Sequence, residues 1–147
     1  MASLKSEGKY KITDDMKAQL ADFYGNYATE AEDAATIKKI YEDCGYVIDT
    51  HTSVAATVYD KYRKETGDTT KTVIASTASP YKFSGSVLAA IGKDTNADEF
   101  GLVDELAEVS KIPVPASLAA LKDKEVRFTK VIDKADMKDY IYSALGI

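Results

Sequence analysis

Two short polar stretches hold the residue types that could do chemistry. The first, DTHTS at residues 49–53, combines a carboxylate, the only histidine of the chain and several hydroxyls. The second, STASPYK at residues 76–82, supplies more hydroxyls and a lysine. Such groups can bind polar ligands and transfer protons. Nothing near Cys44, the single cysteine, has metal-ligand spacing, and no metal site is expected.

Two enzyme patterns can be drawn from these stretches, but both are weak. His51 follows Asp49 by two residues, yet no nucleophile pattern surrounds them, so a structural histidine at a helix entrance is the better interpretation. Ser79 and Lys82 fit the S-x-x-K pattern of serine acyl enzymes, but its S-D-N and K-T-G companions do not occur. On composition alone, Thr77 is a strand-end residue that satisfies backbone groups.

The elements that position these stretches are mainly helices. TEAE at residues 29–32 reads as a capping box that begins a helix over residues 30–44, closed by Gly45, with Cys44 as a small buried hydrophobe on its apolar face. The stretch at residues 49–53 lies at the entrance of a second helix, which ends before Gly67. Further helices are predicted after Thr13, Ser84, Pro115 and Asp133 and around residues 102–109.

A short strand is predicted at the second polar stretch. The run TVIAST at residues 72–77 is β-branched and uncharged, which is typical of a strand buried in a parallel sheet. Val126, Phe128 and Val131 alternate weakly and indicate a possible second strand. A strand needs neighbours for its N–H and C=O groups. Either these two segments pair antiparallel, or the sheet continues in polypeptide that is absent here.

Composition sets the class of protein. The 147 residues are 45% hydrophobic, which is enough apolar surface for a core, and the net charge of −5 comes from interspersed acids and bases. Nucleic acid and membrane partners are therefore not expected. A lone cysteine and a polar N-terminus fit a cytoplasmic setting.

A resemblance to a known family runs through the same stretches. DTHTSVA at residues 49–55 and STASPYKF at residues 76–83, preceded by FYGNYAT at residues 23–29, resemble the C-terminal region of bacterial and fungal threonine synthases in order and spacing. The resemblance extends to at least Ile91 and weakens beyond. It implies one C-terminal domain over residues 1–147, with a part that contributes to the cofactor site (1–92) and a helical tail (93–147).

Membership would imply a mostly helical α/β fragment of a tryptophan-synthase-β-like enzyme with one or two short strands. The reaction would convert O-phospho-L-homoserine and water to L-threonine and phosphate with pyridoxal 5'-phosphate. The resemblance places the hydroxyl of Thr77 against the pyridine nitrogen, with Ser76 as the alternative. It also lines the substrate cavity with Asp49, His51, Thr52, Ser79 and Lys82. Free N–H groups at the helix entrance would favour an anionic substrate group there.

The chain departs from the whole-enzyme pattern in two respects. It contains no motif for the Schiff-base lysine and no glycine-rich cup for the cofactor phosphate. Both are expected in the N-terminal portion of the same enzyme, which would be the main partner of this chain. No catalytic residue is therefore assigned here, and the chain alone should be inactive and bind no cofactor. The alternative is a non-catalytic helical module that serves assembly or regulation.

Overall fold

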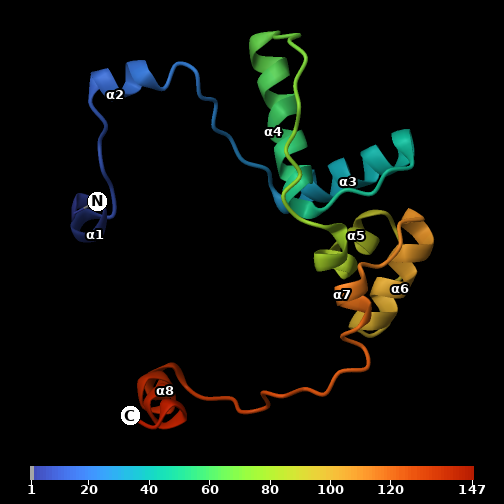
Figure 1. Cartoon of the computed structure of the whole chain (residues 1–147). Helices are drawn as coiled ribbons and strands as arrows, with labels where there is room; N and C mark the ends of the chain where they lie inside the picture. Colours follow the sequence, from blue (N-terminus) through green and yellow to red (C-terminus); the bar gives the residue numbers. More distant parts are fainter. Residues whose placement is uncertain (1) are drawn as a thin grey trace. The chain divides into compact units, whose positions relative to one another are not determined.

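The computed structural model describes residues 2–147 as helices joined by extended segments (Figure 1), and this range contains no strand. The chain consists of two compact units, residues 1–114 and residues 115–147. The first unit contains α1 (Ala2–Glu7), α2 (Asp14–Gln19), α3 (Glu30–Cys44), α4 (Thr50–Thr66), the 3-10 helix η1 (Pro80–Phe83), α5 (Ser84–Ala90) and α6 (Glu99–Ser110). The second contains α7 (Ala116–Ala119), η2 (Lys134–Asp136) and α8 (Met137–Leu145).

The predicted start and end of α3 are confirmed. The Thr29 hydroxyl accepts from the backbone N–H of Glu32 at 3.3 Å, and the Glu32 carboxylate accepts from the backbone N–H of Thr29 at 2.8 Å. Each side chain thus satisfies a donor that the helix leaves unpaired. At the other end Gly45 has a φ of 65°, a left-handed conformation that glycine adopts without strain.

α4 also begins at a side-chain cap and ends at a left-handed glycine. Asp49 is its N-cap residue, and Gly67 closes it with a φ of 69°. α2 also begins as predicted, with the Thr13 side chain accepting from the N–H of Met16. Pro115 precedes the short helix α7 in the second unit. These ends are local features, which is why the sequence predicts them well.

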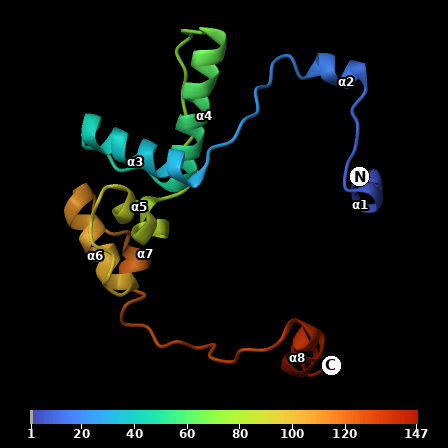
Figure 2. The same ribbon diagram turned by 180° about the vertical axis from the view of Figure 1, so that it is seen from behind.

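The hydrophobic core lies where α3, α5 and α6 meet. α3 packs against both α4 and α5, and α5 packs against α6. Figure 1 shows α3 across the base of α4, with α5 and α6 below it, and Figure 2 shows the same arrangement from behind. The most deeply buried apolar side chains are Ile37, Val87, Leu88 and Leu106. Each contributes about 1.5–3 kcal/mol of transfer free energy relative to an exposed side chain.

Cys44 does not belong to this core. Its side chain is exposed, so the expectation of a small buried hydrophobe is wrong. Along the apolar face of α3, burial decreases from Ile37, which is 1% exposed, to the half-buried Ile40 and Tyr41. Cys44 is in the last turn, next to the exposed cap residue Gly45. Helical periodicity identified the correct face but not how far the packing extends along it.

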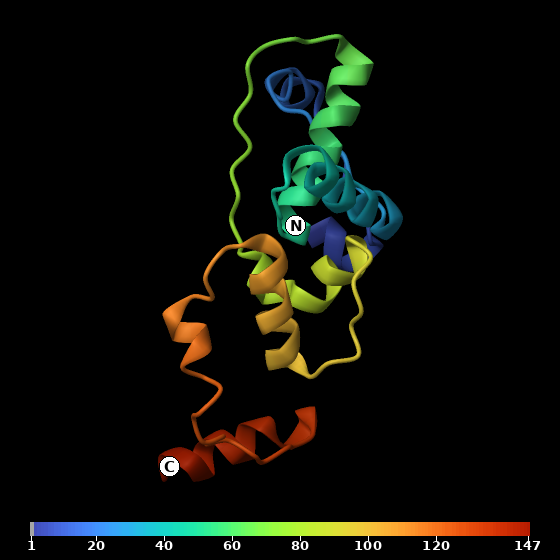
Figure 3. The same ribbon diagram turned by 90° about the vertical axis from the view of Figure 1, so that its right-hand side faces the viewer.

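The predicted strand over residues 72–77 is also wrong for the chain as described. Residues 67–79 return from the end of α4 to η1 without regular secondary structure, as Figure 3 shows. Val73 is 90% exposed. A strand exists only when another strand accepts and donates its backbone hydrogen bonds, and residues 2–147 provide none. Val126, Phe128 and Val131 are likewise exposed and outside any strand, so the second predicted strand is wrong as well.

Lys61 of α4 contacts both α3 and the segment that precedes α3. Its ammonium donates to the backbone carbonyl of Tyr27 at 2.9 Å, lies 2.8 Å from the Glu32 carboxylate, and sits 5.3 Å from the centre of the Tyr27 ring. Nearby, the Tyr24 ring meets the Tyr62 ring edge to face at 5.1 Å. Three stretches of the chain are therefore joined at one lysine.

The second unit is small and leaves apolar side chains exposed. In α8, Met137, Ile141 and Leu145 recur at helical spacing and are 46–67% exposed. Lys130 lies 4.7 Å above the Tyr140 ring. None of the helices described between residues 2 and 147 combines the length and apolar character needed to cross a membrane.

Candidate functional site

The N-terminus of α4 is built around the buried carboxylate of Asp49. This residue is fully buried, and its Oδ2 accepts from the backbone N–H groups of His51 at 2.8 Å and Thr52 at 3.3 Å. Its Oδ1 accepts a short hydrogen bond from the Thr52 hydroxyl. A buried carboxylate is costly unless it is hydrogen-bonded, and here both oxygens have partners.

The same threonine connects α4 to the second polar stretch. The Thr52 Oγ1 lies 2.8 Å from the Oγ of Ser76, which is 24 residues further along the chain. Ser76 itself is exposed. Asp49, Thr52 and Ser76 therefore form one continuous hydrogen-bond chain, which runs from a buried carboxylate to the surface. The structure thus brings three of the residues that the sequence singled out into direct contact.

His51 lies beside this chain, with its ring turned toward η1. The ring centre is 5.0 Å from that of Phe83, and the two planes are inclined by 31°. The Nδ1 atom is 3.5 Å from the Asp49 Oδ2 and 3.4 Å from the Thr50 Oγ1. About 58% of the His51 side chain is exposed, so the imidazole is accessible to a ligand while Phe83 and Asp49 restrain it.

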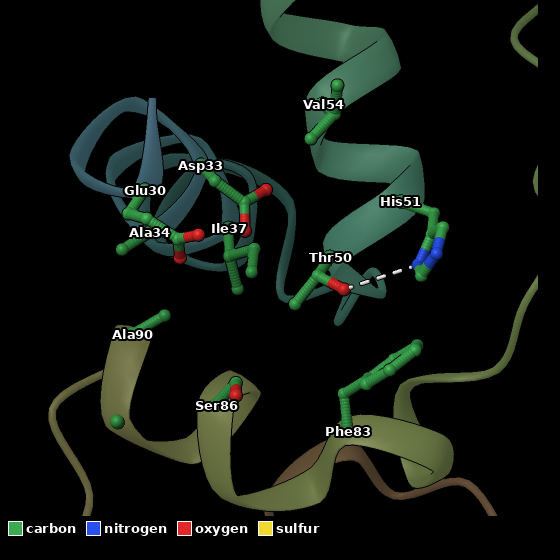
Figure 4. Close-up of a pocket in the computed structure, with 11 residues that line it drawn as sticks. Glu30, Asp33, Ala34, Ile37, Thr50, His51, Val54, Phe83, Ser86 and Ala90 are labelled. Atoms are coloured by element: carbon green, nitrogen blue, oxygen red, sulfur yellow. Dashed lines mark hydrogen bonds between the residues drawn. The ribbon is translucent and has the colours of Figure 1, made fainter. Parts of the chain in front are cut away.

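An open cavity of about 610 Å³ lies between α3, the start of α4 and α5 (Figure 4). Thr50, His51 and Phe83 form one side of it, and Glu30 and Asp33 of α3 form the opposite side. The remaining lining is mostly small or apolar: Ala34, Ile37, Val54, Ser86, Ala89 and Ala90. The cavity can therefore hold a small molecule with both polar and apolar parts.

Asp33 gives this cavity an unusual acidic wall. Its Oδ1 is buried and makes no hydrogen bond to any residue in the range 2–147. Burial raises the pKa of the Asp33 carboxyl above its ordinary value, and the nearby carboxylates of Glu30 and Asp49 act in the same direction. The Ser53 hydroxyl, which donates to the Asp33 backbone carbonyl at 2.8 Å, holds the two helices together beside it.

The other predicted site residues, Thr77, Ser79 and Lys82, belong to the second polar stretch. Thr77 is exposed in the segment without regular structure, immediately after Ser76. Ser79 caps η1, its Oγ accepting from the N–H of Tyr81 at 3.3 Å. Lys82 is exposed, with its ammonium 5.3 Å from the centre of the Phe83 ring. The roles assigned to these residues stay predictions.

The predicted anion site at the entrance of α4 is narrower than the sequence indicates. The N–H groups of His51 and Thr52 donate to Asp49 and are not free to bind an anion. The buried carboxylate also places negative charge where the helix dipole would otherwise attract an anionic group. An incoming phosphate or carboxylate that used these two N–H groups would have to displace Asp49. The sequence showed an Asp at the N-cap position but not that it is fully buried.

Sequence reasoning missed several residues of the cavity. Asp33 and Ser86 show no motif, because one is an acid on a charged helix and the other a small polar residue in an apolar one. Phe83 is only the last residue of the second motif in the sequence, yet it contacts His51. Helical spacing could have placed Asp33 beside Ile37, since residues four apart share a helix face. Among residues 2–147, no cluster of His, Cys, Asp and Glu could hold a metal ion.

Comparison with known proteins identifies the class of domain. The family described as "Threonine synthase, C-terminal" matches residues 52–141, which is more than half of the chain and includes Thr52, Ser76 and Thr77. The helical unit with its hydrogen-bonded helix entrance is therefore a C-terminal portion of the threonine synthase type. The chain belongs to the threonine synthase C-terminal family.

Individual relatives agree with this assignment. Threonine synthase-like 1 of Mus musculus is 33% identical over 107 residues, which cover 71% of this chain and 14% of the mouse protein. Threonine synthase-like 1 of Homo sapiens is 32% identical over 89 residues, which cover 60% of this chain and 12% of the human protein. The chain thus spans about one seventh or less of the length of these relatives.

Proposed function

We propose that this chain forms the C-terminal part of a pyridoxal-phosphate-dependent threonine synthase, which converts O-phospho-L-homoserine and water to L-threonine and phosphate. Family membership supports the proposal, and so does one observation of geometry. The two motif stretches that the family resemblance selects, although 24 residues apart, meet through the Thr52–Ser76 hydrogen bond. A cofactor site made from both stretches needs this proximity.

The residues at this position are chemically suited to the cofactor ring. A pyridine nitrogen needs a single hydrogen-bond donor, and the exposed hydroxyl of Thr77 can supply one. The accessible imidazole of His51 and the neighbouring aromatic ring of Phe83 offer a flat, partly apolar wall. The cofactor phosphate fits less well, because Asp49 occupies the N–H groups at the α4 entrance. We assign the phosphate to the N-terminal portion of the enzyme.

Pyridoxal phosphate, when bound, withdraws electrons from the reacting carbon. The Thr77 hydroxyl would donate a hydrogen bond to the ring nitrogen without transferring its proton, and a neutral hydroxyl would not stabilise a positive charge there as a carboxylate would. His51 lies at the cavity wall, where its exposed imidazole can donate or accept a hydrogen bond to a bound molecule. Asp49 keeps the imidazole on that wall.

The exposed segment before Ser76 supports the need for a partner. Val73 and its β-branched neighbours have the composition of a buried strand but no strand to pair with in residues 2–147. We propose that the N-terminal portion of the enzyme supplies the neighbouring strands and thereby the α/β sheet that the family resemblance implies. It would also supply the Schiff-base lysine. The chain alone is then inactive because that lysine is absent.

The direct test combines this chain with the complementary N-terminal portion of a threonine synthase. Cofactor absorbance and phosphate release from O-phospho-L-homoserine are recorded for the mixture and for each part alone. We expect both signals only in the mixture. Thr77→Val should change the absorbance spectrum and reduce turnover, whereas Thr69→Val, at another exposed position of the same segment, should change neither.

A second variant tests the sheet. Val73→Asp places a charge in the proposed strand and should prevent assembly with the N-terminal portion, although the chain alone should keep its helical fold because Val73 is 90% exposed. Thr69→Asp is the matched control. A well-folded mixture that yields neither cofactor absorbance nor phosphate would contradict the enzyme proposal and favour a non-catalytic helical module.

A further inference from the structure

The hydrogen-bond chain from Asp49 to Ser76 has a fixed direction. An ionised carboxylate only accepts hydrogen bonds, and a threonine hydroxyl has one proton to donate. The Thr52 hydroxyl gives that proton to the Oδ1 of Asp49. In the contact of 2.8 Å with Ser76, Thr52 must therefore act as the acceptor. It follows that Ser76 donates its own proton to Thr52.

This direction distinguishes two hydroxyls that are adjacent in sequence. Ser76 has its only proton committed to Thr52 and can offer other groups nothing but lone pairs. Its side chain is also directed toward α4 by the contact with Thr52. Residues 76 and 77 have no regular secondary structure, and where such backbone is extended neighbouring side chains point to opposite sides, so the contact of Ser76 with Thr52 turns the Thr77 side chain away from Thr52.

We propose that Asp49 and Thr52 are positioning residues, which fix Ser76 as a hydrogen-bond donor to α4 and so reserve Thr77 as the hydroxyl that faces the cofactor nitrogen. The part that concerns the cofactor rests on the proposed function. The positioning role itself rests on contacts within this chain. It also gives the buried carboxylate of Asp49 a role beyond capping α4, because the hydrogen bond from Thr52 to Asp49 fixes the direction of the one between Ser76 and Thr52.

The first experiment uses the chain alone and measures the side-chain rotamer of Ser76. Three-bond couplings between the α and β protons of Ser76 should report a single rotamer in the unmodified chain. Thr52→Val removes the hydroxyl but keeps the shape, and should give averaged couplings with faster motion of the Ser76 and Thr77 amides. Thr52→Ser keeps the hydroxyl and should restore the single rotamer. A rotamer that stays fixed in Thr52→Val would overturn the positioning role.

A matched control comes from the same helix. Thr57 is buried in α4 and its hydroxyl lies 2.7 Å from that of Thr36, so Thr57→Val removes a partly buried side-chain hydrogen bond from the same helix, whereas Thr52→Val removes two hydrogen bonds. Thr57→Val should lower stability and leave the Ser76 couplings unchanged. If Thr57→Val disturbs Ser76 as much as Thr52→Val does, the effect is general loosening of the fold, and the positioning role is wrong.

Asp49→Asn tests the direction of the chain of hydrogen bonds. Asparagine caps helices about as well as aspartate, but its amide nitrogen can donate to Thr52. Thr52 could then donate to Ser76, and the proton of Ser76 would turn outward. In the assembled enzyme Asp49→Asn should therefore shift the cofactor absorbance although α4 remains folded. An unchanged spectrum in an enzyme that binds cofactor would contradict the assigned direction.

The assembled enzyme also separates this inference from the proposed function. Thr52→Val and Ser76→Ala should each weaken cofactor binding about 2- to 10-fold, the value of one net hydrogen bond, and the double variant should be no worse than either. Additive losses would overturn the coupling between the two residues. If the Ser76 rotamer responds as expected but no combination of chains binds cofactor, the positioning contact stands and the proposed enzyme function fails.

Discussion

Replacing Asp49 by alanine should destabilise the helical unit far more than removing an ordinary helix cap. Asp98 is the reference, because it caps α6 through a single hydrogen bond of 2.7 Å from the N–H of Gly101. Losing such a cap typically costs about 1 kcal/mol. Asp49 accepts from two N–H groups and one hydroxyl and is fully buried. Two further donors at roughly 1 kcal/mol each bring its expected loss to about 3 kcal/mol.

Urea unfolding measures this difference. Far-UV circular dichroism follows the helices, and the near-UV tyrosine signal, to which the buried Tyr81 contributes, serves as a second probe of two-state behaviour. With a slope of about 1–3 kcal/mol/M, a difference of about 2 kcal/mol between Asp49→Ala and Asp98→Ala separates their midpoints by roughly 1 M. Midpoints that agree within about 0.2 M would refute the idea that the buried hydrogen bonds of Asp49 stabilise the unit.

Three more predictions concern the helical unit. Hydrogen bonds from Lys61 and Thr29 lower the pKa of Glu32 to about 2. The stabilising contribution of Glu32 should therefore be complete above its ordinary pKa of 4.5 and disappear as the pH falls through about 2. Carbon-13 NMR titration of the carboxyl checks this pKa, and Glu32→Gln should abolish the pH dependence. Leu88→Ala should lower the free energy of unfolding by about 2–5 kcal/mol in urea titrations, because Leu88 is fully buried. Gly45→Ala should lower the free energy of unfolding by about 1–2 kcal/mol, because alanine is strained at a φ of 65°. Gly25→Ala should have no measurable effect, because Gly25 does not have a left-handed φ. An added methyl group meets no atom within 4 Å at either site, so the comparison isolates backbone strain.

The sequence predicts helix ends better than any other feature of this fold. The capping box at Thr29 and the closing glycine at Gly45 depend on residues within one turn, so the code is local and the structure confirms both. The strand over residues 72–77 fails for the opposite reason. Its residues have the right composition, but a strand also depends on a partner strand, which local sequence does not specify.

The candidate site shows the same division between local and distant information. The motifs named Asp49, Thr52 and Ser76 correctly as residues of interest, and the cap role of Asp49 could be expected from its position before α4. The contact between Thr52 and Ser76 depends on the path of residues 67–79 back from the end of α4, which no local pattern encodes. Burial of Asp49 depends on how α3 packs against α4 and was equally out of reach.

The difference between local and distant contacts also sets the order in which parts of the chain fold during synthesis. The pairs α3–α4 and α5–α6 follow closely in sequence, and their contacts should form before the α3–α5 contact because less chain entropy is lost in closing short loops. In the proposed enzyme, the exposed segment around Val73 would gain its β partner only later, when the N-terminal portion joins it. During that interval the segment presents an edge on which copies of the chain can stack, so prompt capture by the correct neighbour protects against aggregation.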